Sequence, residues 1–144
     1  MKACRLSLDY WGGFIVYVNG QEALRRNILP GSTNLLGTVA DDYPVEAWTS
    51  PEGKPIVNQD SAKFPERMAQ RDRRQRNLEI PVRLLRAGHN VVAIELHMAP
   101  IEYRAMAAYW QRWAPIGLFA ARLSVSPGAA CSIRCPRTTK CAGS

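Results

Sequence analysis

The chain has 144 residues, 47% of them hydrophobic, which suits one domain with a single core. It contains no run of 18 apolar residues and hence no predicted membrane span. Asp9 and the pair Gly12-Gly13 interrupt its start, so we predict no signal peptide in this chain. The formal net charge of +7 favours acidic partners in general, such as nucleic acid or anionic glycans.

The N-terminal part predicts three strands and a tight turn. Residues 4–10 alternate between apolar and polar side chains, which indicates a half-buried strand. Residues 14–18 are apolar throughout and rich in β-branched and aromatic types, which predicts a strand covered on both faces. Asn19-Gly20 follows, and both residues tolerate the positive φ that a type I′ turn requires. Residues 21–25 are then expected to return as a short strand.

The middle of the chain predicts loops. Residues 27–60 are rich in Pro, Gly, Ser, Thr and Asn, with short strands expected around residues 35–39 and 56–57. So long a connection is a common place for a binding site. The charged residues 62–76 predict either a short helix or a mobile loop.

The second half predicts three more strands and one helix. Strands are expected at residues 78–82, where Pro81 indicates a strand edge or a strand end, and at residues 91–97. Residues 102–113 show apolar side chains at steps of three and four, which predicts a short helix. The last strand, 117–125, is expected to face the core through Phe119, Ala121, Leu123 and Val125.

Several short strands with one helix indicate an all-β fold, an antiparallel jelly-roll β-sandwich. The strands are too few for a complete eight-stranded jelly roll, so we predict that the first strands are lacking. The sandwich is expected to occupy residues 1–127, and residues 128–144 are expected to be a disordered, Cys-containing tail.

Four cysteines are present, Cys4, Cys131, Cys135 and Cys141. The spacing of the last three is not that of a zinc knuckle, and no histidine lies near them, so we predict no metal. Disulfides in an exported protein and unpaired surface thiols both remain open, with thiols favoured. Asp41, Asp42 and Asp60 match no calcium-loop spacing, and no cofactor is predicted.

Three segments resemble galactose-binding-domain-like modules, the jelly rolls of β-galactosidase type. The first is Leu8 to Gly31, with a Gly-containing start, an aromatic-rich strand, Asn-Gly and a Pro-Gly loop. The second is Leu85 to His97, with Gly, Asn, a strand and Glu-x-His, and the third, weaker one is Trp113 to Leu123. The resemblance spans roughly residues 5–125; the absent upstream strands and the Cys-containing tail depart from it.

The resemblance implies an accessory module of large secreted bacterial proteins, often beside glycoside hydrolases. It therefore implies a carbohydrate-binding or spacer role without chemistry of its own, in an exported parent protein. The two departures suggest a fragment of a longer chain. The expected partners are a carbohydrate or a neighbouring catalytic domain.

Candidate ligand-binding residues combine aromatic faces for sugar rings with polar groups for hydroxyls. They are Tyr10, Trp11, Arg25, Arg26, Tyr43, Trp48, Glu95 and His97. For Trp11 and Trp48 a site and a core position are equally compatible with the sequence. A solvated strand edge is the favoured alternative for Arg25 and Arg26, and a structural histidine is the favoured alternative for His97.

The sequence argues against an enzyme. No carboxylate pair, Gly-x-Ser-x-Gly elbow or Cys–His pair has a catalytic context. Two other functions remain open: a purely structural packing or spacer domain, and polyanion binding through the basic run Arg67–Arg76. That run is not interleaved with aromatics, so we favour a solvated loop there and do not expect nucleic acid as the partner.

Overall fold

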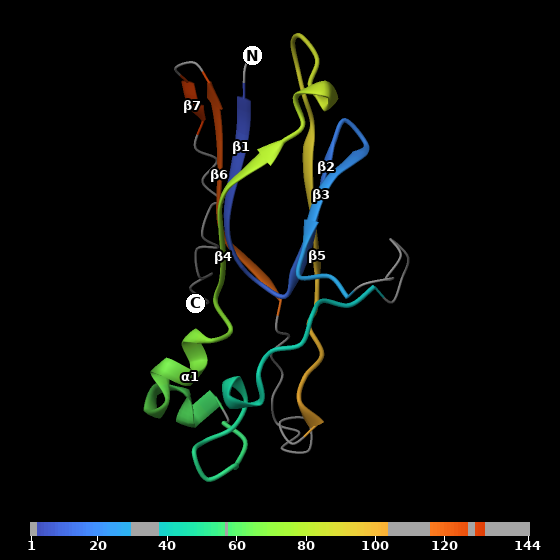
Figure 1. Cartoon of the computed structure of the whole chain (residues 1–144). Coiled ribbons are helices and arrows are strands. Elements are labelled where there is room, and N and C mark those ends of the chain that lie inside the picture. Colours follow the sequence, from blue (N-terminus) through green and yellow to red (C-terminus); the bar gives the residue numbers. More distant parts are fainter. Residues whose placement is uncertain (1–2, 30–37, 57, 104–115, 127–128, 132–144) are drawn as a thin grey trace, which may run out of the picture.

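Two antiparallel sheets pack face to face in the computed structural model, which describes residues 3–29, 38–56, 58–103, 116–126 and 129–131 (Figure 1). The strands are β1 (Ala3–Trp11), β2 (Gly13–Val18), β3 (Gln21–Arg26), β4 (Arg73–Ile80), β5 (Val92–His97), β6 (Gly117–Ser126) and β7 (Ala129–Cys131). The first sheet has the order β4-β1-β6, with the three-residue β7 added beside β6, and the second has the order β3-β2-β5. The helical elements are the α-helix α1 (Pro65–Ala69) and the 3-10 turns η1 (Val45–Ala47), η2 (Asn58–Lys63) and η3 (Val82–Leu84).

The main core lies between the sheets. In the first sheet, every second residue of β1 and the last residue of β4 are buried in this core. In the second sheet, the side chains on the inward side of β2 are buried in it. Its buried members are Cys4, Leu6, Leu8, Tyr10, Phe14, Val16, Val18 and Ile80. The predicted period-two strand and the predicted fully covered strand are therefore both confirmed.

The β2–β3 hairpin turns at Asn19 and Gly20, whose φ values of 52° and 82° are the two positive angles predicted for this turn. The Asn19 side chain also donates to the carbonyl oxygen of Leu84 at 2.8 Å and to Oδ1 of Asn90 at 3.0 Å. Its own Oδ1 accepts from the backbone N–H of Val91 at 3.1 Å. Asn19 thus holds the segment before β5 against the hairpin as well as shaping the turn.

The chain passes from the first sheet to the second at Gly12 and Gly13. Gly12 has φ 82°, a conformation that costs a residue with a side chain about 1 kcal/mol or more. A Cβ on Gly13 would lie 2.1 Å from the carbonyl oxygen of Asn27, so the two backbones meet there. The glycine pair therefore makes the sharp bend between β1 and β2 that Figure 1 shows.

A second, smaller core closes the end of the sandwich beside this bend. It contains Ala40, Tyr43, Ala47, Trp48 and Ala99. Arg71 is fully buried against it, with its guanidinium 4.4 Å from the Trp48 ring centre and donating to the Ala47 carbonyl oxygen at 2.6 and 2.9 Å. Burial lowers the pKa of Arg71 to about 10, and the nearby Tyr43 opposes that shift.

The basic run Arg67–Arg76 begins in the short helix that is one of the two alternatives predicted for residues 62–76, and it ends in β4, so the predicted solvated loop is wrong. Residues 65–69 form α1, and β4 begins at Arg73. Arg73 donates to the carbonyl oxygens of Gly12 at 2.8 Å and Asp41 at 2.9 Å, and its guanidinium lies 4.1 Å from the Tyr43 ring centre. Arginine carries five donors in a planar fork, so one side chain can join the bend, the loop before η1 and β4.

The predicted inward position of Phe119 is also wrong. Asp9 pairs with Ala120 but Tyr10 pairs with Leu118, so a β-bulge leaves Phe119 without a partner on β1. Leu118 packs against the core in its place, and Phe119 is 57% exposed. The other inward residues predicted for this strand, Ala121, Leu123 and Val125, do pack against the core.

The coarse fold prediction is confirmed as a mostly β, sandwich-like pair of antiparallel sheets with one short α-helix. Near the short strands expected at 35–39 and 56–57, the described residues form one bridge between Ile28 and Ala40 and one between Thr49 and Pro55. Several predictions fall outside the described residues. They concern residues 35–37, residue 57, most of the expected helix 102–113 with its two tryptophans, and the tail from residue 132. Strand β7 pairs with β6 just beyond the expected domain end at 127.

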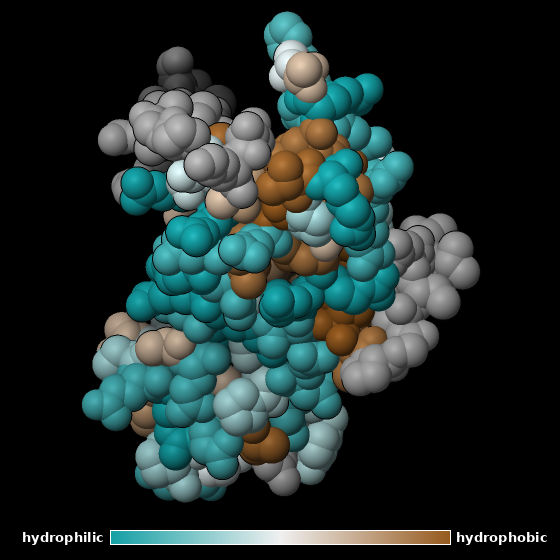
Figure 2. Space-filling view, turned by 45° about the horizontal axis from the view of Figure 1, so that its top comes forward, coloured by the Kyte–Doolittle hydropathy of each residue, from teal (hydrophilic) through white to brown (hydrophobic). Residues whose placement is uncertain are grey.

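The space-filling view shows apolar surface between the two sheets at the end that faces the reader (Figure 2). Val82 and Val91, which flank the segment leading into β5, are 41% and 65% exposed. Among the described residues, β3 and β5 form the two edges of their sheet. The sandwich therefore presents open edges and some uncovered apolar surface.

Candidate functional site

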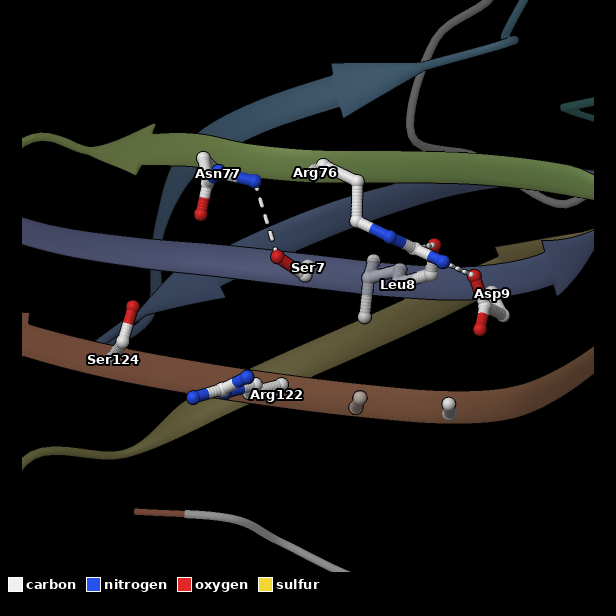
Figure 3. Close-up of a pocket in the computed structure, with 9 residues that line it drawn as sticks. Ser7, Leu8, Asp9, Arg76, Asn77, Arg122 and Ser124 are labelled. Atoms are coloured by element: carbon white, nitrogen blue, oxygen red, sulfur yellow. Dashed lines mark hydrogen bonds and ion pairs between the residues drawn. The ribbon is translucent and has the colours of Figure 1, made fainter. Parts of the chain in front are cut away.

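The outer face of β4, β1 and β6 contains a hollow of about 470 Å³, which we call the Ser7 hollow (Figure 3). It is lined by Ser7, Leu8, Asp9, Arg76, Asn77, Ala120, Ala121, Arg122 and Ser124. Opposite Asp9, β6 contributes Ala120, whose side chain is too short to fill the space.

A bulge in β4 shapes one wall of the Ser7 hollow. Leu6 pairs with Leu78 and Leu8 pairs with Gln75, so two residues, Arg76 and Asn77, lie opposite Ser7 alone. Asn77 takes a φ of 55°, and its backbone N–H donates to Ser7 Oγ at 3.0 Å. Bulges commonly re-aim side chains beside functional sites, and this one turns Arg76 across β1.

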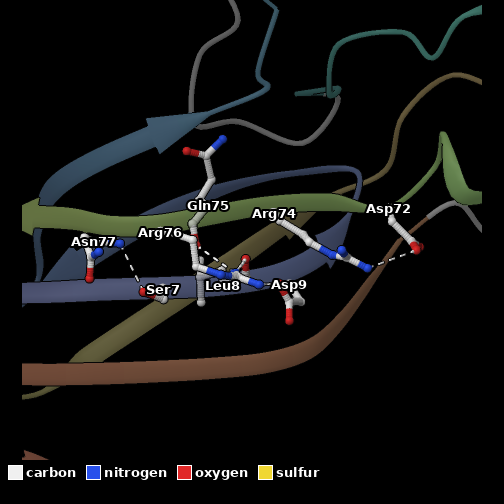
Figure 4. A network of polar contacts seen from close by, with 8 residues as sticks. All are labelled: Ser7, Leu8, Asp9, Asp72, Arg74, Gln75, Arg76 and Asn77. Carbon is white, nitrogen blue, oxygen red and sulfur yellow. Dashed lines mark hydrogen bonds and ion pairs between the residues drawn. The ribbon is translucent and has the colours of Figure 1, made fainter.

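An ion pair fixes the next wall. Arg76 Nη2 lies 2.5 Å from Asp9 Oδ1, and its Nη1 donates to the Leu8 carbonyl oxygen at 3.1 Å (Figure 4). The two side chains are 53% and 33% exposed. Because they bind each other, the Arg76 cation is largely neutralised within the hollow.

The β6 bulge forms an aromatic corner from Trp11 and Phe119. The two ring centres are 5.1 Å apart at an interplanar angle of 74°, an edge-to-face arrangement. Trp11 Nε1 donates to Asp72 Oδ1 at 2.8 Å, which orients the indole. Gly117, the cross-strand partner of Trp11, has no side chain, and a Cβ there would lie 3.0 Å from the Phe119 ring.

The aromatic corner and the Ser7 hollow belong to one continuous surface. A second depression of about 230 Å³ includes Asp9, Trp11, Arg74 and Phe119, so it shares Asp9 with the Ser7 hollow. A third depression, of about 390 Å³, shares Trp11 with the second and extends to α1. From Ser7 to Trp11 this surface follows β1 for about 13 Å, long enough to contact more than one unit of a polymer.

Acidic and basic side chains alternate on this face. Its cations are Arg5, Arg74, Arg76 and Arg122, and its acids are Asp9, Asp72 and Glu79. Arg74 lies 3.8 Å from Asp72, and Arg5 is opposite Glu79 in the register of β1 and β4. Arg122 forms no hydrogen bond or ion pair within the described part of the chain.

The structure places three of the sequence-predicted aromatic residues inside the molecule. Tyr10, Tyr43 and Trp48 are 1%, 7% and 2% exposed, so as placed they do not offer a ring face to a ligand. Tyr10 donates to Asn27 Oδ1 at 2.6 Å, and the Tyr43 hydroxyl accepts from the Gly12 N–H at 2.7 Å. Burial raises the pKa of both tyrosines. Of the four aromatic candidates, Trp11 alone belongs to the aromatic corner.

The remaining predicted site residues belong to the other sheet. Arg25 forms a two-point ion pair with Glu22 at 2.6 and 2.7 Å, and Arg26 donates to the Arg25 carbonyl oxygen at 2.7 Å. His97 is 8% exposed; its Nδ1 lies 3.0 Å from the Thr38 carbonyl oxygen and its Nε2 lies 3.1 Å from Glu95 Oε1. The eight predicted residues are therefore spread over both sheets and the closed end and do not form one site.

Sequence reasoning missed most of the Ser7 hollow. The alternation in β1 indicated that Ser7 and Asp9 share a polar face, but nothing local placed Arg76 or Arg122 beside them. The only local signal was Asn77, because asparagine tolerates the positive φ of a bulge.

Among the described residues no cluster of three or more His, Cys, Asp or Glu could hold a metal ion. No helix in that part of the chain is long and apolar enough to cross a membrane. Comparisons with protein-family models, curated proteins and solved structures found no match. They lend no support to the resemblance to galactose-binding-like modules. What the structure establishes is the fold, a pair of antiparallel β-sheets, and no family.

Proposed function

We propose that this protein is a non-catalytic carbohydrate-binding module whose binding surface is the outer face of β4, β1 and β6. The observation that carries the proposal is the aromatic corner beside a polar hollow on one continuous surface. Sugars are bound through contact of their apolar C–H faces with aromatic rings and through hydrogen bonds to their hydroxyls.

The Ser7 hollow supplies such hydrogen-bonding groups. Ser7 Oγ accepts from the Asn77 N–H and retains its own O–H as a donor, while Asp9 has a carboxylate 33% exposed. Both groups stand on β1, an inner strand of a hydrogen-bonded sheet, so little conformational entropy is lost when a ligand binds. The expected ligand is a glycan chain rather than a small molecule, because the surface is shallow and elongated.

The polyanion alternative through Arg67–Arg76 has less support. Four of the five arginines in that run donate to backbone carbonyl oxygens of the protein, namely Arg67, Arg71, Arg73 and Arg76. Arg74, with a side chain 66% exposed, is the most accessible of the five. Most of the run therefore stabilises the fold and does not form an open basic surface.

Affinity electrophoresis of the full chain through gels that contain soluble polysaccharides tests the proposal. We expect retardation by at least one polysaccharide, and loss of that retardation in Phe119→Ala, which removes an exposed ring without opening a core cavity. Trp11→Phe is expected to keep part of the retardation, because it retains a ring but loses the bond to Asp72. Tyr103→Ala, a change of another exposed aromatic residue, is the matched control.

Circular dichroism must show that each variant is folded. If the folded wild-type chain is retarded by none of the polysaccharides, the carbohydrate proposal is wrong. The structural packing role would then be favoured, since the sandwich has uncovered apolar surface that a neighbouring domain could bury.

A further inference from the structure

We propose that the Ser7 hollow binds the carboxylate of an acidic sugar, so that the preferred ligand is a glycan that contains uronic acid. This inference rests on the proposed function and narrows it to a class of ligand. It is carried by the position of Arg122, on β6, within a hollow whose other charges are already paired.

Of the three charged side chains that line the hollow, Arg122 is the one without an ion-pair partner among the described residues. Arg76 Nη2 and Asp9 Oδ1 lie 2.5 Å apart, so the two charges neutralise each other, and both residues line the hollow. Arg122 is exposed, pairs with Ser7 in the register of β1 and β6, and has no polar partner among the described residues. A neutral sugar would leave this guanidinium without a counter-charge, whereas a carboxylate would supply one.

The neighbouring groups fit a carboxylate as well. The planar guanidinium of Arg122 can donate two parallel hydrogen bonds to the two oxygens of a carboxylate. Ser7 lies directly across from it, and its hydroxyl can donate a further bond. Figure 3 shows Ser7, Arg76 and Asp9 along one side of the hollow and Arg122 on the strand at its other side.

The aromatic corner gives the ligand a direction. Asp9 belongs both to the Ser7 hollow and to the depression that contains Trp11 and Phe119. A glycan chain laid along β1 would therefore place one sugar ring at the aromatic corner and the acidic group of another at Arg122.

The test compares polysaccharides that share a backbone and differ in their acid groups. Suitable pairs are polygalacturonate with its methyl ester and glucuronoxylan with unsubstituted xylan. We expect the wild-type chain to bind at least one acidic member about tenfold more tightly than its neutral counterpart, as one charge-assisted hydrogen-bonded contact predicts. Arg122→Gln should remove most of the difference between the two affinities, chiefly by weakening the binding of the acidic member.

Arg83→Gln is the matched control, because it removes the same charge from an exposed position on η3, outside the hollow. If Arg83→Gln lowers the acidic preference as much as Arg122→Gln, general attraction to a chain of charge +7 explains the binding and the inference fails. Equal affinity of the wild type for acidic and neutral members also overturns it, while the carbohydrate proposal survives. Binding to no member of either pair and to no other polysaccharide overturns both.

Discussion

A methyl group at Gly13 is expected to destabilise the fold strongly. The added Cβ would lie 2.1 Å from the Asn27 carbonyl oxygen and 2.9 Å from its carbonyl carbon. Asn27 has little freedom to retreat, since its carbonyl accepts from the Asp41 N–H at 3.0 Å and its side chain accepts from Tyr10 at 2.6 Å.

Overpacking of a well-filled site costs about 1–3 kcal/mol, and a lost backbone hydrogen bond adds about 1 kcal/mol. The free energy of unfolding of Gly13→Ala should therefore fall by about 2–4 kcal/mol. For a domain of this size such a loss lowers the melting temperature by roughly 10 °C.

Urea denaturation followed by far-ultraviolet circular dichroism measures this loss. Gly20→Ala is the control, because Gly20 has φ +82° but no atom within 4 Å of the added Cβ. The free energy of unfolding of Gly20→Ala should fall only by the cost of placing a residue with a side chain in the left-handed region, about 1 kcal/mol. If Gly13→Ala is no less stable than Gly20→Ala, the close approach of the two backbones does not exist in solution.

Three further predictions concern residues that hold the fold. Arg73→Lys should lower the free energy of unfolding by about 2 kcal/mol, because an ammonium cannot replace the planar fork, whereas the exposed Arg74→Lys should change it by less than about 0.5 kcal/mol; equal urea midpoints would contradict this. Cys4 is buried and its thiol pKa is raised by burial, so, with the other three cysteines changed to serine, a thiol reagent should modify it only as fast as the fold opens; rapid labelling of the folded chain would count against its position. Burial raises the pKa of Tyr10 and Tyr43, so the stability they contribute is complete below the unfolded value of about 10 and declines as the pH rises above it; Tyr10→Phe should weaken that decline in urea titrations between about pH 9 and 11.5, and an unaltered slope would show that Tyr10 does not take part.

The local patterns of the chain were enough to predict the strands that form the core. Period-two alternation in β1, the continuous apolar run of β2 and Asn19-Gly20 each depend on neighbouring residues alone. These patterns predict a strand or a turn whichever strand lies beside it. The same holds for the polar outer face of β1, on which the candidate site later proved to lie.

Which side chains meet on that face was decided by the register between strands. The bulge opposite Ser7 and the bulge at Phe119 each add one residue to one strand, and the alternation of either sequence by itself does not show them. They turn Phe119 outward to Trp11 and place Arg76 and Arg122 around one hollow.

Tertiary packing also decided which aromatic and basic residues are accessible. Tyr43 and Trp48 come from a Pro-rich segment whose sequence predicts an open loop, yet both are buried. The guanidinium of Arg71 covers the Trp48 ring, and that of Arg73 covers the Tyr43 ring. Arginine can be buried when its donors find carbonyl oxygens and its plane lies on an aromatic ring, and those partners are distant in sequence. The sequence by itself therefore determined a sandwich-like β fold with a polar outer face, whereas the contacts between distant segments determined which side chains form the candidate site on that face.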